Sequence, residues 1–157
     1  MTGDSKVKVP MAFGTKLTPS LEKPTVDVNL SRQMIGSLMY LITSRLDIMF
    51  SICYCARFQA NPREAYMIDV KNIFRYLKRT TSLGLWYPAK SGFIVQSFSD
   101  ADLGRCGLDR KSTTGGCQFL DGKLVNWQSK KQTCVSLSTA EAEYIVAASC
   151  TSQVIWI

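Results

Sequence analysis

The spacing of apolar residues in this 157-residue chain changes from helical to strand-like near Thr81. Before that point apolar side chains recur every three or four residues, which places them on one face of an α-helix. After it, short apolar runs are separated by glycine, proline and aspartate, which is the pattern of strands and turns. The sequence therefore predicts an α+β protein in which a small helical bundle precedes a sheet.

The region before this change divides into an arm and a bundle. Residues 1–30 carry prolines and scattered charges with little periodicity, which predicts an extended linker arm. Residues 31–82 are expected to form about three helices, the third with Asn61 as its N-cap and Pro62 at its first position. The expected apolar stripes are Ile35, Leu38, Met39 and Ile42; Ile48, Ile52, Cys55 and Phe58; and Met67, Val70, Ile73, Phe74 and Leu77.

Residues 83–157 are expected to form short strands followed by one helix. Asp121-Gly122 between two apolar runs is a strong signal for a two-residue hairpin turn. The final helix is expected to begin at Ser138, because Ser138 and Glu141 have the spacing of a capping box. The expected strands are Leu83–Tyr87, Phe93–Asp100, Thr114–Leu120, Lys123–Ser129 and Thr133–Leu137.

The charge balance favours a polyanionic partner. Lysine and arginine number 19 against 12 acidic residues, a formal net charge of +7. Such an excess favours nucleic acid first, although the basic pairs are also consistent with a solvated surface. The candidates for phosphate binding are Arg110, Lys111, Lys130 and Lys131.

The complete absence of histidine limits the chemistry. It excludes Ser-His-Asp and Cys-His nucleophilic catalysis and zinc sites that use imidazole. The six cysteines contain no C-x-x-C pair, so we expect free and mostly buried thiols in a reducing, intracellular compartment, cytoplasmic or nuclear. No secretory signal or bilayer-length apolar segment is visible, so neither secretion nor a membrane partner is expected.

Three carboxylates stand out. Asp100 and Asp102 share one face if the strand extends that far, and they could either cap the strand before a turn or hold a metal ion. Glu143 falls on the small apolar stripe of the final helix, where a carboxylate needs a partner or a cation unless it lies at a solvated edge. That stripe is expected to consist of Ala140, Ala147, Cys150 and Val154.

Carboxylates of this kind suit magnesium. Hard divalent cations prefer oxygen ligands, and bound cations can activate water and stabilise a leaving oxygen without histidine. Asp100 from a strand end and Glu143 from the following helix would supply half of such a site.

Several segments then point to a family. The segments "SDADLG", "DRKSTTGGCQFL" and "VNWQSKKQTCVSLSTAEAEYIVAA" resemble the ribonuclease H region of Ty1/copia-type retrotransposon Pol polyproteins. Upstream, "RQMIGSLMYLITSRLDIMFSI" and "IFRYLKRTTSLGLWY" resemble the end of the reverse transcriptase and its connection. The resemblance covers about residues 30–157 and is carried by several motifs in the family's order.

The resemblance implies a ribonuclease H-like fold with a mixed sheet, its first three strands antiparallel and followed by a helix. It implies cleavage of the RNA strand of RNA–DNA hybrids with Mg²⁺. Asp100 matches the family's first metal-binding aspartate and Glu143 its helix glutamate, whereas no catalytic role is assigned to Asp102. The implied partners are nucleic acid and the remainder of the Pol polyprotein.

The family places its third metal carboxylate on a strand that would lie beyond Ile157. We therefore expect residues 83–157 to be the N-terminal part of a truncated ribonuclease H domain with an incomplete ligand set and little nuclease activity. The alternatives are a non-catalytic, basic nucleic-acid-binding remnant and a translated pseudogene product.

Overall fold

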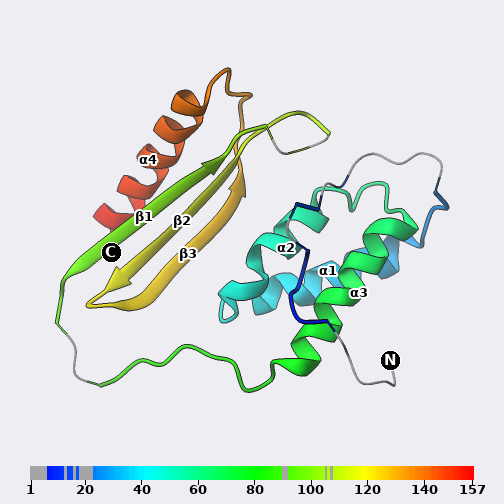
Figure 1. Ribbon diagram of the computed structural model, residues 1–157, viewed down its shortest axis with the longest axis horizontal. Coiled ribbons are helices and arrows are strands. Elements are labelled where there is room, and N and C mark those ends of the chain that lie inside the picture. The colour runs from blue at the N-terminus through cyan, green and yellow to red at the C-terminus, as the bar shows by residue number, and fades with distance from the viewer. Residues whose placement is uncertain are drawn as a thin grey trace. The chain divides into compact units, whose positions relative to one another are not determined.

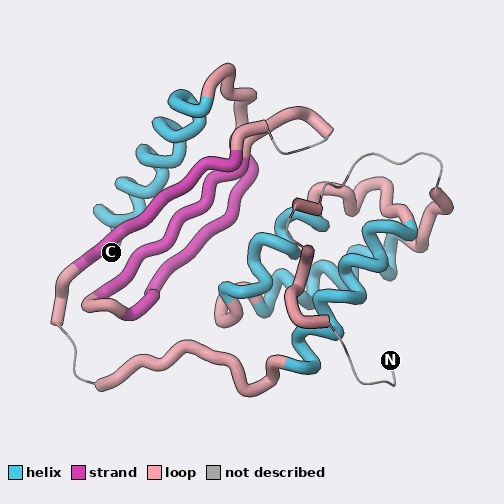
Figure 2. The backbone as a smooth tube through the Cα atoms, viewed as in Figure 1, coloured by secondary structure: helices cyan, strands magenta, loops and turns pink. Residues whose placement is uncertain are grey.

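The computed structural model describes residues 7–12, 14–15, 17, 23–89, 92–104, 106 and 108–157. It consists of two compact units, Met1–Gly84 (the helical unit) and Leu85–Ile157 (the sheet unit). Figure 1 labels the elements and Figure 2 separates helices, strands and loops by colour. The helical unit contains α1 (Val28–Leu41), α2 (Leu46–Ala56) and α3 (Glu64–Arg79), and the sheet unit contains β1 (Val95–Asp102), β2 (Thr113–Leu120), β3 (Lys123–Lys131) and α4 (Thr139–Trp156).

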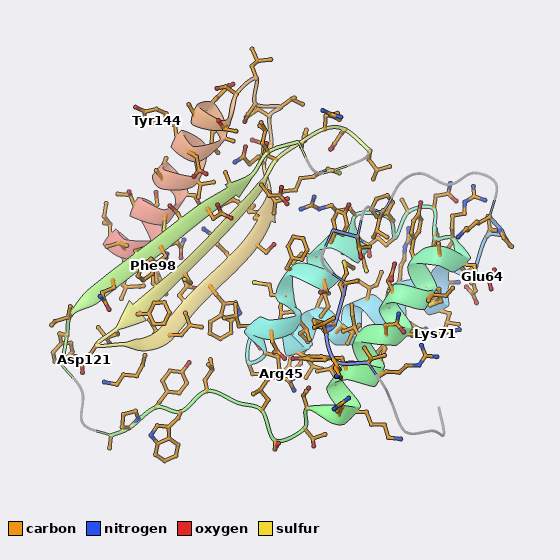
Figure 3. The ribbon with its side chains drawn as sticks, in the orientation of Figure 1. Arg45, Glu64, Lys71, Phe98, Asp121 and Tyr144 are labelled. Carbon is orange, nitrogen blue, oxygen red and sulfur yellow. The ribbon has the colours of Figure 1, made fainter. Side chains whose placement is uncertain are left out.

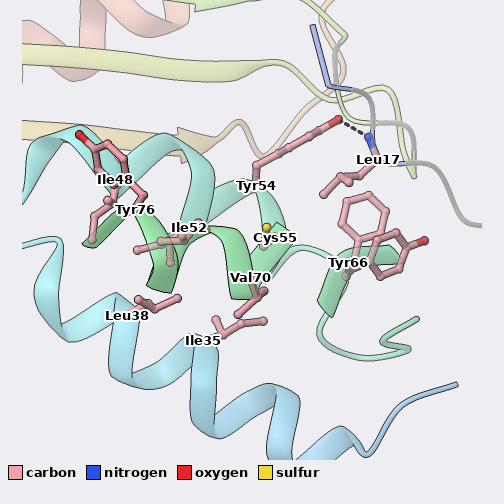
Figure 4. Close-up of a cluster of buried hydrophobic side chains, with 12 residues drawn as sticks. Leu17, Ile35, Leu38, Ile48, Ile52, Tyr54, Cys55, Tyr66, Val70 and Tyr76 are labelled. Carbon is pink, nitrogen blue, oxygen red and sulfur yellow. Dashed lines mark hydrogen bonds between the residues drawn. The ribbon is translucent and has the colours of Figure 1, made fainter. Parts of the chain in front are cut away.

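The core of the helical unit is formed by apolar faces of all three helices (Figure 4). Most expected stripe residues are buried, whereas Met39 is exposed. Leu17, which lies in the expected arm, also enters this core, and its backbone N–H donates to the Tyr54 hydroxyl at 3.1 Å. The buried members are Leu17, Ile35, Leu38, Ile48, Ile52, Tyr54, Cys55, Phe58, Tyr66, Val70, Ile73 and Tyr76.

The start of α3 differs from the prediction. The helix begins at Glu64 with Arg63 as its N-cap, so Asn61 and Pro62 precede it. The chain is held extended here by the segment before α1: Val26 N donates to Pro62 O, and Glu64 N donates to Pro24 O, both at 3.2 Å. These long-range hydrogen bonds override the local start signal.

The sheet is antiparallel, with strand order β1-β2-β3. Asp121 and Gly122 form the turn between β2 and β3 with φ of 48° and 76°, which are the two positive values that a type I′ hairpin requires. The predicted turn is therefore confirmed. The register pairs Asp100 with Gly115 and Asp102 with Thr113, so β1 continues two residues beyond its expected end.

Two of the expected strands do not form. Leu83–Tyr87 is an irregular segment, in which the Tyr87 hydroxyl donates to Leu124 O at 2.6 Å. Thr133–Leu137 is also irregular, because its polar groups serve the start of α4: Leu137 N donates to Glu141 Oε2 at 2.7 Å. In the second segment, the Glu141 carboxylate thus takes a backbone N–H that could otherwise join a strand ladder.

Helix α4 covers one face of the sheet (Figure 1). Ser138 caps it as predicted, accepting from Glu141 N at 3.2 Å. The buried stripe consists of Ala142, Val146 and Cys150. Of the stripe expected from the sequence, Cys150 is buried and Val154 is half-buried. Ala140 and Ala147 are exposed, so the prediction was wrong for these two.

A polar cluster under α4 explains this orientation. Cys150 Sγ lies 2.8 Å from Ser97 Oγ and 3.2 Å from Gln118 Nε2. Gln118 is fully buried and accepts from Asn126 Nδ2 at 2.8 Å. Burying these polar groups requires that they be paired, so the helix turns Cys150 toward them.

Candidate functional site

Asp100 lies on the face of β1 that points away from α4. Ser97 contacts Cys150 of α4, so Ser97 faces the helix. Successive residues of a strand alternate between faces, which places Phe98, Asp100 and Asp102 on the other side. The ring contact between Phe98, which is labelled in Figure 3, and Phe119 of β2 agrees with this assignment. Asp100 is exposed there.

Glu143 reaches β1 from the second turn of α4. Its Oε1 accepts a hydrogen bond from the backbone N–H of Ala101 at 3.2 Å. Within the described residues no strand pairs with the outer edge of β1, so the Ala101 N–H is available to a side chain. The structure thus brings the Glu143 carboxylate to the peptide that immediately follows Asp100, at the open edge of the sheet.

The two neighbouring acids have other roles. Glu141 is occupied at the start of α4, where it accepts from Leu137 N at 2.7 Å. Asp102 is the last residue of β1 and is followed by a turn at Leu103 and Gly104, the latter with φ of 57°. This position suits the turn-forming interpretation of Asp102.

The donor set at this edge fits magnesium by its chemistry. Mg²⁺ is commonly bound by one or two carboxylates, with waters and substrate phosphates completing its shell. Asp100 offers its carboxylate from the face of β1 away from α4, and Glu143 offers its own from α4 at the open edge of the same strand. Among the described residues no group of three or more Asp, Glu, Cys or His side chains is placed to hold a metal ion. The ligand set found here is therefore small.

The four predicted phosphate-binding residues gather at one end of the sheet. Lys130 and Lys131 end β3 opposite Thr114 and Thr113, and Arg110 and Lys111 lie just before Thr113 in the chain. Because Thr113 also pairs with Asp102, this basic end is the end of the sheet that carries the carboxylates. Arg110 and Lys130 are exposed, and the other two are half-buried.

Lys131 differs from the others because it has an acidic partner. Its Nζ lies 2.8 Å from Asp109 Oδ2. This hydrogen bond, followed by smaller ones from Cys106 and the Lys111 backbone, outweighs partial burial and lowers the pKa of Asp109 to about 2. Asp109 did not stand out in the sequence, because the pair depends on how the loop before β2 lies beside the end of β3.

The comparisons with known proteins bear on the whole chain. A retrovirus-related Pol polyprotein from transposon TNT 1-94 of Nicotiana tabacum is 36% identical over 164 aligned residues, covering 100% of this chain and 12% of the relative. The Pol polyprotein from transposon RE1 of Arabidopsis thaliana is 33% identical, covering 96% of this chain and 10% of the relative. The chain belongs to the copia-type retrotransposon Pol polyprotein family.

The copia-type match spans a small part of these long polyproteins. A shorter protein named secreted RxLR effector protein 161, from Plasmopara viticola, is 32% identical over 124 residues, covering 78% of this chain and 87% of that protein. No protein-family model and no solved structure matches the chain. No helix in the described part of the chain has the length and apolar character needed to cross a membrane.

Proposed function

We propose that the sheet unit is part of a ribonuclease H domain that hydrolyses the RNA strand of RNA–DNA hybrids, with Asp100 and Glu143 as Mg²⁺ ligands. The observation that carries the proposal is the hydrogen bond from Ala101 N–H to Glu143 Oε1. It holds the helix carboxylate at the peptide that follows Asp100, on the open edge of β1. The Asp100 side chain lies on the face away from α4, so the cation would bind at this edge, between the two faces. Membership of the copia-type Pol family supports this assignment.

The rest of the sheet unit positions these carboxylates. Pairing with Gly115 fixes Asp100 in the ladder of β1 and β2. The Ser138 cap and the packing of Cys150 fix α4 and hence Glu143. A bound Mg²⁺ would polarise the scissile phosphate and activate water. The basic end would bind flanking phosphates, since lysine and arginine contacts to phosphate position a nucleic acid without reading its sequence.

Two carboxylates are expected to hold Mg²⁺ weakly. We therefore expect the isolated 157-residue chain to bind a hybrid in Mg²⁺ but to cleave it little. The remainder of the Pol polyprotein, which is far longer than this chain in the matched relatives, is the proposed partner that completes the activity.

The test measures binding of a labelled RNA–DNA hybrid by fluorescence anisotropy, with and without Mg²⁺ at constant ionic strength. We expect Mg²⁺ to strengthen binding, and Asp100→Asn and Glu143→Gln to remove that gain. Asp102→Asn is the matched control, because it removes the same charge two residues away and should leave the gain in place. The assignment of these ligands would be refuted if Mg²⁺ did not strengthen hybrid binding by the wild-type chain. It would also be refuted if Mg²⁺ strengthened binding by Asp100→Asn equally.

Cleavage of the same hybrid tests the expectation that two carboxylates hold Mg²⁺ too weakly for nuclease activity. We expect the wild-type chain to release no more product than the Asp100→Asn variant does. Robust cleavage that Asp100→Asn abolishes would show that the two carboxylates suffice.

A second candidate function is non-catalytic nucleic-acid binding. The gathering of Arg110, Lys111, Lys130 and Lys131 at the basic end favours it. It predicts binding that weakens with salt, since phosphate contacts release counterions, and that is independent of Mg²⁺ and of Asp100. Lys130→Gln should weaken such binding, whereas Lys78→Gln in α3, which removes the same charge, should not. No binding at low salt would exclude this function.

A further inference from the structure

The position opposite Asp100 in the sheet is a glycine, Gly115. Glycine is unfavourable inside a strand, where it has no side chain to pack and loses more conformational freedom than other residues. Its presence therefore calls for a local reason. Three are possible: a positive φ, close packing within the protein, or close approach of another molecule.

The first two reasons do not apply. Gly115 does not have a positive φ, unlike Gly104 and Gly122. A Cβ added at Gly115 would meet only the backbone oxygen of Asp100, at 3.5 Å, which is an ordinary van der Waals contact. The neighbouring Gly116 is different, because a Cβ there would lie 3.3 Å from Gln128 Nε2 and 3.8 Å from Cys150 Sγ. Internal packing under α4 explains Gly116 but not Gly115.

The side chains around Gly115 indicate what approaches. Cross-strand neighbours share a face of the sheet and lie about 5 Å apart. Gly115 pairs with Asp100 on one side and with Ser129 on the other. On the face away from α4, the missing side chain therefore leaves a gap between a carboxylate and a hydroxyl. Lys131 follows Ser129 by two residues in β3 and therefore lies on the same face. Its ammonium has three N–H donors, so donors remain beyond its bond to Asp109. Serine hydroxyls and lysine are characteristic phosphate-binding groups.

We infer that the missing side chain at Gly115 leaves room for the sugar–phosphate backbone of a nucleic-acid strand to reach Asp100. We call this the clearance role of Gly115. The inference rests on the proposed function, because the strand is the hybrid strand that Asp100 would contact through its cation. Ser129 and Lys131 bind the phosphate on the far side of the gap. A side chain at position 115 fills the gap and keeps the strand away from the carboxylate.

The test compares Gly115→Val and Gly115→Ala with Gly116→Ala in the full chain. Binding is measured by the fluorescence anisotropy of the labelled RNA–DNA hybrid in Mg²⁺, and stability by thermal unfolding. We expect Gly115→Val to weaken binding about tenfold or more, Gly115→Ala to weaken it less, and neither to lower Tm. Gly116→Ala is the matched control, because it adds the same methyl group on the α4 face of the sheet, beside Gln128 Nε2, and should keep the wild-type affinity. If Gly115→Val does not fold, the result for Gly115→Ala decides.

The outcomes separate this inference from the function on which it rests. Wild-type affinity in both Gly115 variants, with Mg²⁺-dependent binding still lost in Asp100→Asn, would overturn the clearance role alone. Absence of Mg²⁺-dependent binding in the wild-type chain would overturn the proposed function and the clearance role with it.

Discussion

Glu143 Oε1 lies 3.2 Å from the amide nitrogen of Ala101, the residue that follows Asp100 in β1. The contact joins the second turn of α4 to the outer edge of the sheet. Asp100 and Glu143 are far apart in sequence, and the packing of α4 on β1 and β2 brings their positions together. This relationship gives the sheet unit a testable site and distinguishes Glu143 from Glu141, which serves the helix start.

The helical unit makes a separate prediction at Asp47. Its carboxylate accepts from Arg45 Nη2 at 2.7 Å and from the Tyr76 hydroxyl at 2.8 Å, which joins the start of α2 to α3. Asp47→Ala leaves both donors without this partner, so we expect it to reduce the free energy of unfolding by about 2 kcal/mol. Urea denaturation of the full chain, followed by helical circular dichroism, measures the change.

The pH dependence of this effect has a defined sign. Burial raises the pKa of Asp47, but the hydrogen bonds from Arg45 and Tyr76 outweigh it, so the pKa is lowered from 3.8. A lowered carboxylate pKa stabilises the folded state above the unfolded pKa, and this contribution is lost as pH falls through the folded value. The difference between wild type and Asp47→Ala should therefore shrink below about pH 4.

Asp69 of α3 provides the control for Asp47. Burial raises its pKa, with Lys23 opposing the shift, so its charge is disfavoured in the folded state. Asp69→Asn should not destabilise the protein at neutral pH. Equal losses of stability in Asp47→Ala and Asp69→Asn would contradict the role given to the Asp47 hydrogen bonds.

The pair of Asp109 and Lys131 predicts a gain in nucleic-acid binding. Asp109→Asn releases Lys131 from its 2.8 Å ion pair and should strengthen hybrid binding at neutral pH. Asp121→Asn is the matched control, because it makes the same charge change and frees Lys123 from a 2.7 Å pair at the opposite end of the sheet. Anisotropy titrations that show the same gain for both variants would assign the effect to net charge instead.

Thiol reactivity tests the burial of the cysteines. All six are free, as the sequence predicted, and Cys134 alone is exposed. Burial raises the pKa of Cys55 to about 12, with Asp69 adding to the shift, and burial also raises the pKa values of Cys53 and Cys117. Because the thiolate is the reactive form, a disulfide reagent should label one thiol quickly near pH 8. Cys134→Ser should remove that fast phase, and its persistence would contradict the structure.

Local signals in the sequence were sufficient where neighbouring residues determine the conformation. The Asp121-Gly122 turn and the Ser138 cap formed as predicted, because each depends on a few adjacent groups. The start of α3 was missed because Pro24 and Val26, distant in sequence, hold residues around Pro62 extended.

The orientation of α4 was missed for a related reason. An even distribution of small and apolar residues gives this helix no dominant face. The buried Gln118 pairs with Cys150, and Ala142 and Val146 are buried on the same stripe. The same limit applies to the site. Spacing made Asp100 and Glu143 candidates, but strand register was needed to show that Gly115 lies opposite Asp100.

The most direct test of the proposed metal site is a Mg²⁺ titration of the ¹⁵N-labelled chain, followed through amide chemical shifts. We predict a saturable shift at Ala101, whose N–H contacts Glu143. Asp100→Asn and Glu143→Gln should abolish this shift, and Asp102→Asn should retain it. The absence of a saturable shift at Ala101, or an unchanged shift in Asp100→Asn, would contradict the assignment of Asp100 and Glu143 as magnesium ligands.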